Sequence, residues 1–80
     1  MAPRKGWRPS LAKRRAVAEF VAEHLRRFRY APTLEGIAEH MGWESRGQVQ
    51  IVLRALEEDG CIQRSPTHHH PIIEMRIPES

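Results

Sequence analysis

The sequence between residues 39 and 56, EHMGWESRGQVQIVLRAL, contains a short helical pattern and a longer one, separated by very few residues. Gly42 is typical of the left-handed residue that ends a helix, and Ser45 is typical of the N-cap that begins one. Apolar residues recur at spacings of three and four on both sides of this corner, which indicates a buried face on each helix. The two sets are Leu34, Ile37, Ala38 and Met41, then Val49, Val52, Leu53 and Leu56. A connection this short fixes the angle at which the two helices cross.

A third helical pattern precedes this corner. Ser10 is a suitable N-cap, and an apolar stripe follows it at helical spacing. The stripe comprises Val17, Phe20, Val21, His24, Leu25 and Phe28. Pro32 disfavours helical geometry in the residue before it, so residues 30–33 should end this helix, and Thr33 should cap the next. Gly36 lies inside that next helix, where glycine costs about 1 kcal/mol relative to alanine. We therefore expect another backbone to pass close to Gly36.

After Gly60 the spacing of apolar residues changes to two, which predicts a two-stranded β-hairpin. Residues 65–71 should form its tip. The side chains expected to face inward are Ile62, Ile73, Met75 and Ile77. The predicted fold is mainly α with a small β-hairpin. Three helices followed by a hairpin make a winged helix-turn-helix, in which the hairpin is the wing.

Length and composition predict a single small domain. An 80-residue chain can bury one modest core. No apolar run exceeds three residues, whereas a membrane span needs roughly twenty. The only cysteine, Cys61, excludes an internal disulfide and cysteine-rich zinc modules, and we expect it to be a buried structural thiol in a cytoplasmic protein. The expected organisation is a flexible basic arm at residues 1–9, the winged helix-turn-helix domain at 10–77 and a tail at 78–80.

The formal net charge of +3 is distributed unevenly along the chain. Residues 1–29 contain nine Lys or Arg and two Glu, whereas residues 30–80 contain four Arg and eight acidic residues. A basic N-terminal part favours a polyanionic partner, although a solvated helix face would produce the same pattern. The four serines lack suitably placed histidine and acidic partners, and there is no glycine-rich phosphate loop. We therefore expect no enzyme activity, no cofactor, no metal and no small-molecule ligand.

The stretch YAPTLEGIAEHMGWESRGQVQIVLRALEEDGCIQRSP resembles the N-terminal DNA-binding domain of the LexA repressor family. The matching positions are Tyr30, Pro32, Thr33, Leu34, Ile37, Ala38, Met41, Gly42, Trp43, Ser45, Val49, Leu53, Ala55, Leu56, Glu57, Gly60 and Ile62. The resemblance extends over residues 15–76. It implies a nucleoid-associated transcriptional repressor that binds operator DNA as a homodimer, with the helix at residues 45–59 in the major groove and the wing on the backbone.

The resemblance also implies which residues contact DNA. Those directed at base edges are Ser45, Gly47, Gln48, Gln50 and Ile51. Glutamine amides suit adenine because they carry a donor and an acceptor together, and an isoleucine can contact a thymine methyl group. Arginines are suited to phosphates. The residues expected to contact phosphates are Thr33, Arg46, Arg54, His68 and His69.

The chain departs from the family pattern at three places. Arg46 and Gly47 stand where family members have a polar residue and a proline, and Ile51 stands where they have a polar residue. We therefore expect an operator different from the family's. Full-length members also carry a C-terminal self-cleaving domain, which these 80 residues lack. If the 80 residues are the full natural protein, we expect no switching by self-cleavage.

Three features leave alternatives open. Ile51 could be covered by the wing or could contact a protein, and the domain would then be a winged-helix protein-interaction module, such as a small phage-type protein that binds a host protein. The histidines at 68–70 could bind phosphates, could bind a metal with Cys61, or could have no role. The basic arm could lie along DNA or be a free tail.

Overall fold

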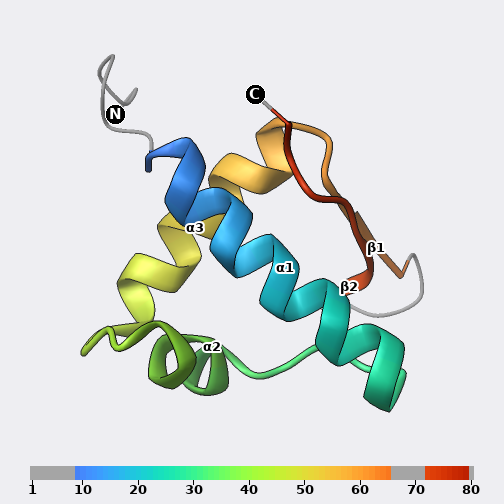
Figure 1. Ribbon diagram of the computed structural model, residues 1–80, viewed down its shortest axis with the longest axis horizontal. Coiled ribbons are helices and arrows are strands. Elements are labelled where there is room, and N and C mark those ends of the chain that lie inside the picture. The colour runs from blue at the N-terminus through green and yellow to red at the C-terminus, as the bar shows by residue number, and fades with distance from the viewer. Residues whose placement is uncertain (1–8, 66–71, 80) are drawn as a thin grey trace.

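The helices begin at the three N-caps that the sequence predicts. The computed structural model describes residues 9–65 and 72–79, which include α1 (Leu11–Phe28), α2 (Leu34–Met41) and α3 (Arg46–Glu58) (Figure 1). Ser10, Thr33 and Ser45 precede them. Each hydroxyl accepts a hydrogen bond from a backbone N–H two or three residues further on, at 2.9–3.2 Å. Each cap therefore pairs a backbone donor that the helix itself leaves unpaired.

Left-handed residues end two of the helices. Gly42 follows α2 with φ 74°, as the sequence predicts, and the tight corner to Ser45 begins there. At the end of α1, Arg29 takes φ 68°, and its N–H donates to the Leu25 carbonyl at 2.9 Å. An arginine is unusual in this conformation, which favours glycine and asparagine. The sequence gives no local sign of this cap.

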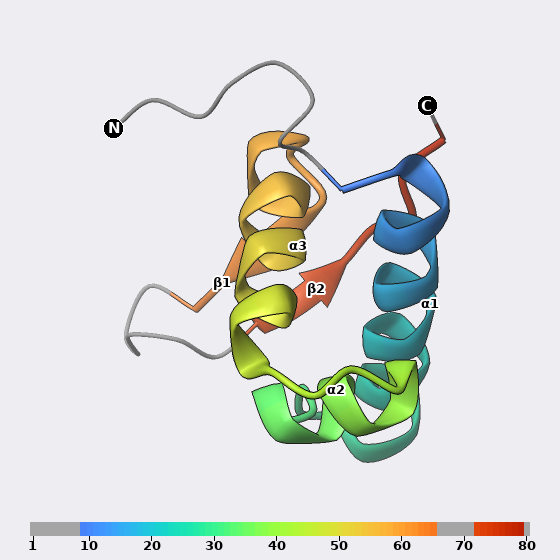
Figure 2. The ribbon, with the colours of Figure 1, turned by 90° about the vertical axis from the view of Figure 1, so that its left-hand side faces the viewer.

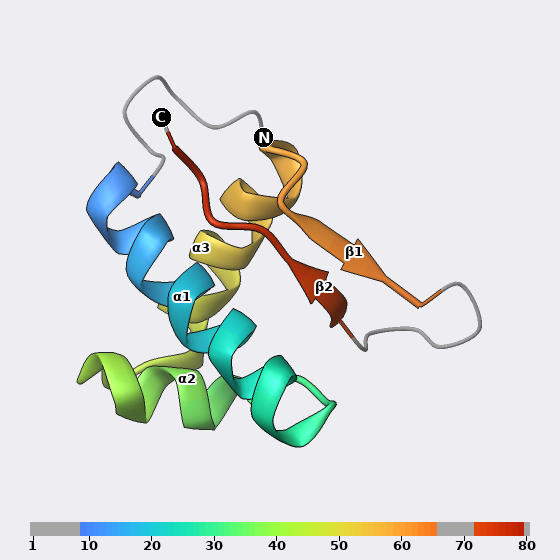
Figure 3. The same cartoon turned by 45° about the vertical axis from the view of Figure 1, so that its right-hand side comes forward.

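Strands β1 (Ile62–Arg64) and β2 (Ile72–Met75) pair antiparallel and form the wing. Three helices with this hairpin confirm the predicted winged helix-turn-helix fold. In Figure 2, α1 and α3 lie side by side while α2 crosses below them, and Figure 3 shows the strands next to the helices. The packing of α1 against α3 and β2, and of α2 against α3, encloses one core. Its largest fully buried side chains are Val17, Val21, Ile37, Val49 and Leu56.

The inward direction predicted for Ile73 is wrong. Ile73 is 51% exposed, whereas Ile72 and Met75 are buried. The cause is a register shift: Gln63 pairs with Glu74, but the next residue of β1 pairs with Ile72, so Ile73 is an extra residue in β2. A β-bulge of this kind breaks the alternation of side chains between the two faces.

Two smaller expectations also need correction. Phe28, predicted on the buried stripe of α1, is 51% exposed because it lies in the last turn, beyond the described core. Among the described residues, no distant backbone lies within 4 Å of a Cβ built at Gly36. A Cβ there would lie 3.2 Å from the Thr33 hydroxyl, so the glycine leaves room for the cap of its own helix.

The predicted domain boundaries stay a prediction. Most of the expected arm and the wing tip, residues 1–8 and 66–71, lie outside the described residues. None of the helices in the described part of the chain combines the length and the hydrophobicity that a membrane span requires.

Candidate nucleic-acid interface

The outward face of α3 is built by helical periodicity. Gly47, Gln50, Ile51 and Arg54 occupy positions i, i+3, i+4 and i+7, so they share one side of the helix. All four are exposed. The opposite side is buried in the core through Val49, Val52, Leu53, Ala55 and Leu56. The helix thus anchors itself with one face and presents the other, the outward face, to solvent.

The first turn of α3 leaves its backbone accessible. Ser45 is exposed, and its Oγ accepts the N–H of Gly47 at 3.0 Å. A Cβ at Gly47 would lie only 3.1 Å from that oxygen. Glycine therefore leaves space for the cap, and it also allows a ligand to approach the helix closely. Gly47 stands at one of the positions where the sequence departs from the family pattern.

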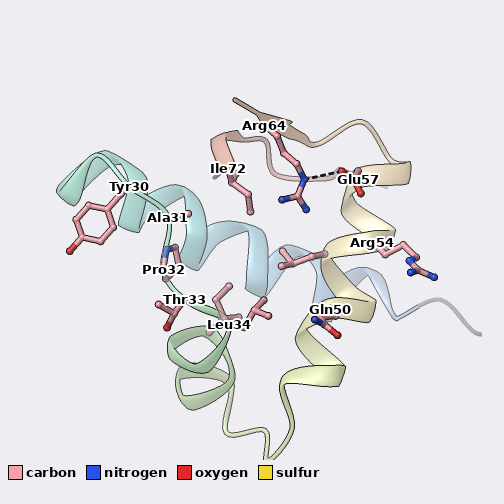
Figure 4. Close-up of a pocket in the computed structure, with 12 residues that line it drawn as sticks. Tyr30, Ala31, Pro32, Thr33, Leu34, Gln50, Arg54, Glu57, Arg64 and Ile72 are labelled. Carbon is pink, nitrogen blue, oxygen red and sulfur yellow. Dashed lines mark hydrogen bonds and ion pairs between the residues drawn. The ribbon is translucent and has the colours of Figure 1, made fainter. Parts of the chain in front are cut away.

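A groove runs along one flank of α3 (Figure 4). Gln50, Arg54 and Glu57 line it from α3, and Arg64 and Ile72 line it from the wing. The segment from Tyr30 to Leu34, including Thr33, forms the third side. The groove therefore brings Thr33 and Gln50, both predicted to contact DNA, to one concave surface. In Figure 4 the guanidinium group of Arg54 points away from this groove.

An ion pair connects α3 to the wing across this groove. Arg64 Nε donates to Glu57 Oε2 at 3.0 Å, with the two side chains 31% and 52% exposed. An exposed pair of this kind contributes about 0–1 kcal/mol to stability. The main effect of the ion pair is on the position of the wing, because it connects the first strand of the wing to the last turn of α3. Sequence reasoning did not single out Arg64, since its partner is in another element.

The opposite flank of α3 borders a second, smaller hollow. Gln48 and Ile51 line it from α3, together with Trp43 from the corner and Pro9 and Lys13 from the start of α1. Ile51 is 45% exposed there, so the wing does not bury it. Two of the predicted base-contacting residues therefore lie on this flank, whereas Gln50 lies on the flank of the larger groove.

The basic and acidic side chains of α3 are separated along the helix. Arg46 is 3.8 Å from Glu35, with side chains 65% and 74% exposed, so this contact is weak. Arg54 forms no ion pair with any described residue. The acidic residues of α3 come only in its last turn, where Glu57 is held by Arg64. The arginines of α3 thus precede its glutamates along the helix.

A partly buried ion pair holds α1 against the C-terminal end of α3. Arg14 Nη1 contacts Asp59 Oδ2 at 2.6 Å, with the side chains only 12% and 19% exposed. The Nε of the same arginine donates to the Pro9 carbonyl at 3.1 Å. Arg14 is therefore occupied in holding the start of α1 in place, and it contributes little free charge to the surface.

Cys61 is buried at the start of the wing, as predicted for a structural thiol. Burial raises the pKa of its thiol above the ordinary value, and the nearby Asp59 carboxylate raises it further, against smaller opposing effects of Arg14 and Arg76. A raised pKa lowers the thiolate fraction at neutral pH, and the thiolate is the reactive form.

The predicted DNA-contacting residues are thus distributed around α3. Ser45 is exposed at its N-cap, and Thr33 lies across the groove from it. The residues exposed on the helix itself are Arg46, Gly47, Gln48, Gln50, Ile51 and Arg54. His68 and His69 lie outside the described residues. Within residues 9–65 and 72–79, no group of histidine, cysteine and acidic side chains could hold a metal ion. The contacts assigned to each residue stay predictions.

Comparison of the sequence with known protein families agrees with this geometry. The family model for the LexA DNA binding domain matches residues 5–70, which is most of the chain. No curated protein and no solved structure matches it. The matched segment contains all three helices and the first strand of the wing. The chain therefore belongs to the LexA DNA binding domain family and binds double-stranded DNA.

Proposed function

We propose that this protein is a sequence-specific transcriptional repressor that inserts α3 into the DNA major groove. The observation that carries this proposal is the outward face of α3, which is exposed along Gly47, Gln50, Ile51 and Arg54 while the other face is buried. An α-helix about 10–12 Å wide fits a major groove about 12 Å wide. A domain that occupies an operator blocks other proteins from the same DNA, which is sufficient for repression.

Base recognition is assigned to the first half of α3. The amides of Gln48 and Gln50 suit adenine, and Ile51 suits a thymine methyl group. Gly47 allows the helix to approach the base edges, because no side chain stands between them. The Ser45 hydroxyl accepts the Gly47 N–H and keeps its own proton to donate. This set would favour sites rich in A·T pairs.

Contacts with the DNA backbone are assigned to residues around the base-contacting residues. Arg46 and Arg54 carry cations that no buried ion pair holds, and the Thr33 hydroxyl lies across the groove from α3. His68 and His69 at the wing tip would contribute further phosphate contacts, more strongly when protonated. These contacts fix the position of α3 on the duplex but carry little sequence information.

The proposal includes binding as a homodimer to an inverted repeat. One α3 spans only a few base pairs, and helix-turn-helix dimers gain specificity by binding two half-sites on the same face of the duplex, one helical turn or a multiple of it apart. Both copies would then face DNA with the same interface.

Arg46→Ala tests the DNA interface against the alternative of a protein-docking surface. Removing a phosphate contact should weaken binding to specific and random duplexes alike and should reduce the slope of log K against log salt by about 0.9. The measurement is fluorescence anisotropy over a series of salt concentrations. An unchanged slope contradicts a phosphate contact at Arg46. Binding by the wild type that hardly depends on salt would favour an apolar protein partner at Ile51 instead.

A further inference from the structure

The small hollow beside Ile51 places a lysine next to the predicted base-contacting residues. It has a volume of about 190 Å³ and is lined by Gln48, Ile51, Trp43, Pro9 and Lys13. Pro9, Trp43 and Ile51 supply apolar lining, and Lys13 supplies a cation. Lys13 is exposed, and its side chain forms no ion pair with a described residue. Its backbone N–H donates to the Ser10 hydroxyl in the cap of α1.

The side chains on the two flanks of α3 point to different sides of the helix. Gln50, with Thr33 across the groove, belongs to one flank, and Gln48 and Ile51 belong to the other. Arg46 precedes Gln50 by four residues in α3, so it shares the flank of Gln50. A major groove has two walls, one from each DNA strand, and a helix about as wide as the groove approaches both. Under the proposed function, residues on opposite flanks therefore face phosphates of opposite strands.

We propose that Lys13 is a second backbone clamp, which binds a phosphate of the strand opposite to the one contacted by Arg46. This inference rests on the proposed insertion of α3 into the major groove. The hollow sets the sugar of that strand against Ile51 and Trp43 and brings the phosphate to the Lys13 ammonium group. The start of α1 is held rigidly against α3 by the Arg14–Asp59 pair, so the clamp is formed before DNA binds.

The sequence provides a matched control for Lys13 within the same helix. Arg15 is also exposed and also basic, but it lies two residues further on, about 200° around α1 at 100° per residue. It therefore faces away from the hollow. Lys13→Gln and Arg15→Gln change the net charge equally. A difference between them reports a local contact and not the general attraction between a basic protein and DNA.

The experiment first selects a preferred duplex with the wild type and then measures binding of Lys13→Gln and Arg15→Gln to it and to random DNA. Lys13→Gln should weaken both by a similar factor and should reduce the salt slope by about 0.9. Arg15→Gln should leave the slope close to that of the wild type. Circular dichroism melting of both variants checks the fold, which should be unchanged because the Lys13 side chain is not used in the helix cap.

A scan with methylphosphonate, which neutralises one phosphate at a time, locates the contact. Within one half-site, Lys13→Gln should become insensitive to neutralisation at one or two phosphates of one strand, and Arg46→Gln at phosphates of the other strand. Equal salt slopes for Lys13→Gln and Arg15→Gln, or loss of sensitivity in a half-site on the same strand as Arg46→Gln, would overturn the second clamp. If the wild type selects no duplex at all, the proposed function fails, and the clamp fails with it.

Discussion

The two faces of α3 differ in the side chains that they carry. On the inward face, Val49 and Leu56 are completely buried. On the outward face, Gln50 and Ile51 are exposed. Under the proposed function, one helix would therefore contribute to stability and to recognition through different side chains. The difference indicates that substitutions on α3 should separate into two classes, those that unfold the domain and those that change DNA binding alone.

The largest expected effect is on the inward face. Leu56→Ala removes a fully buried side chain from the centre of the core and should lower the free energy of unfolding by about 2–5 kcal/mol. The measurement is urea denaturation followed by circular dichroism. DNA binding should decrease only in proportion to the fraction of the protein that is unfolded. A cost below about 1 kcal/mol would mean that α3 is not the main contributor to the core.

Gln50→Ala is the matched change on the outward face. It should change the free energy of unfolding by no more than about 0.5 kcal/mol, because the side chain is exposed. It should weaken binding to the preferred duplex by about 1–3 kcal/mol, because an amide pair to a base is lost. Binding to random DNA should change little. Equal losses on the two duplexes would contradict base recognition by Gln50.

Ser45 caps α3 and is also predicted to contact DNA. Substitutions of Ser45 therefore test whether effects on stability and effects on DNA binding can be separated. Ser45→Ala removes the cap of α3 and should cost about 1 kcal/mol of unfolding free energy. Ser45→Asp keeps an oxygen that can cap the helix, so stability should recover, but its carboxylate should repel phosphates and weaken binding to any DNA. Denaturation and anisotropy on the same samples give both values. Wild-type DNA affinity in Ser45→Asp would place the start of α3 away from the duplex.

The smallest expected effect concerns Cys61 and should leave the outward face untouched. Its thiol pKa is raised in the folded protein, first by burial, so the folded state binds the proton more tightly than the unfolded state. The stabilisation is present below the ordinary thiol pKa of about 8.5 and declines as pH rises through the folded pKa. Urea denaturation at neutral and alkaline pH should show a steeper alkaline decline for the wild type than for Cys61→Ala. Parallel declines would contradict this.

Local signals in the sequence were sufficient for most of the fold. Ser10, Thr33 and Ser45 begin helices because a hydroxyl pairs an open backbone N–H, and Gly42 ends one because it tolerates positive φ. These effects act within a few residues. The inward faces of α2 and α3 follow from helical periodicity for the same reason. The bulge at Ile73 was missed because it depends on how two strands pair, which periodicity along one strand does not reveal.

The candidate site was predictable only in part. Periodicity and the family pattern indicated the outward face of α3, including Gln50 and Ile51. The same information could not associate Lys13 with Ile51, because they become neighbours only through the crossing of α1 and α3. The Glu57–Arg64 pair likewise depends on the placement of the wing. Contacts between distant elements are set by tertiary packing, so they need the structure.

The central claim is that the outward face of α3 reads a DNA sequence. The most direct test is to select binding sites for the wild-type protein from a pool of random duplexes at about 0.15 M salt, with Gln50→Ala in parallel. The account predicts enrichment of an inverted repeat by the wild type and relaxed selection by Gln50→Ala at one position of each half-site. Salt-sensitive binding with no enriched sequence, or identical selection by both proteins, would contradict it.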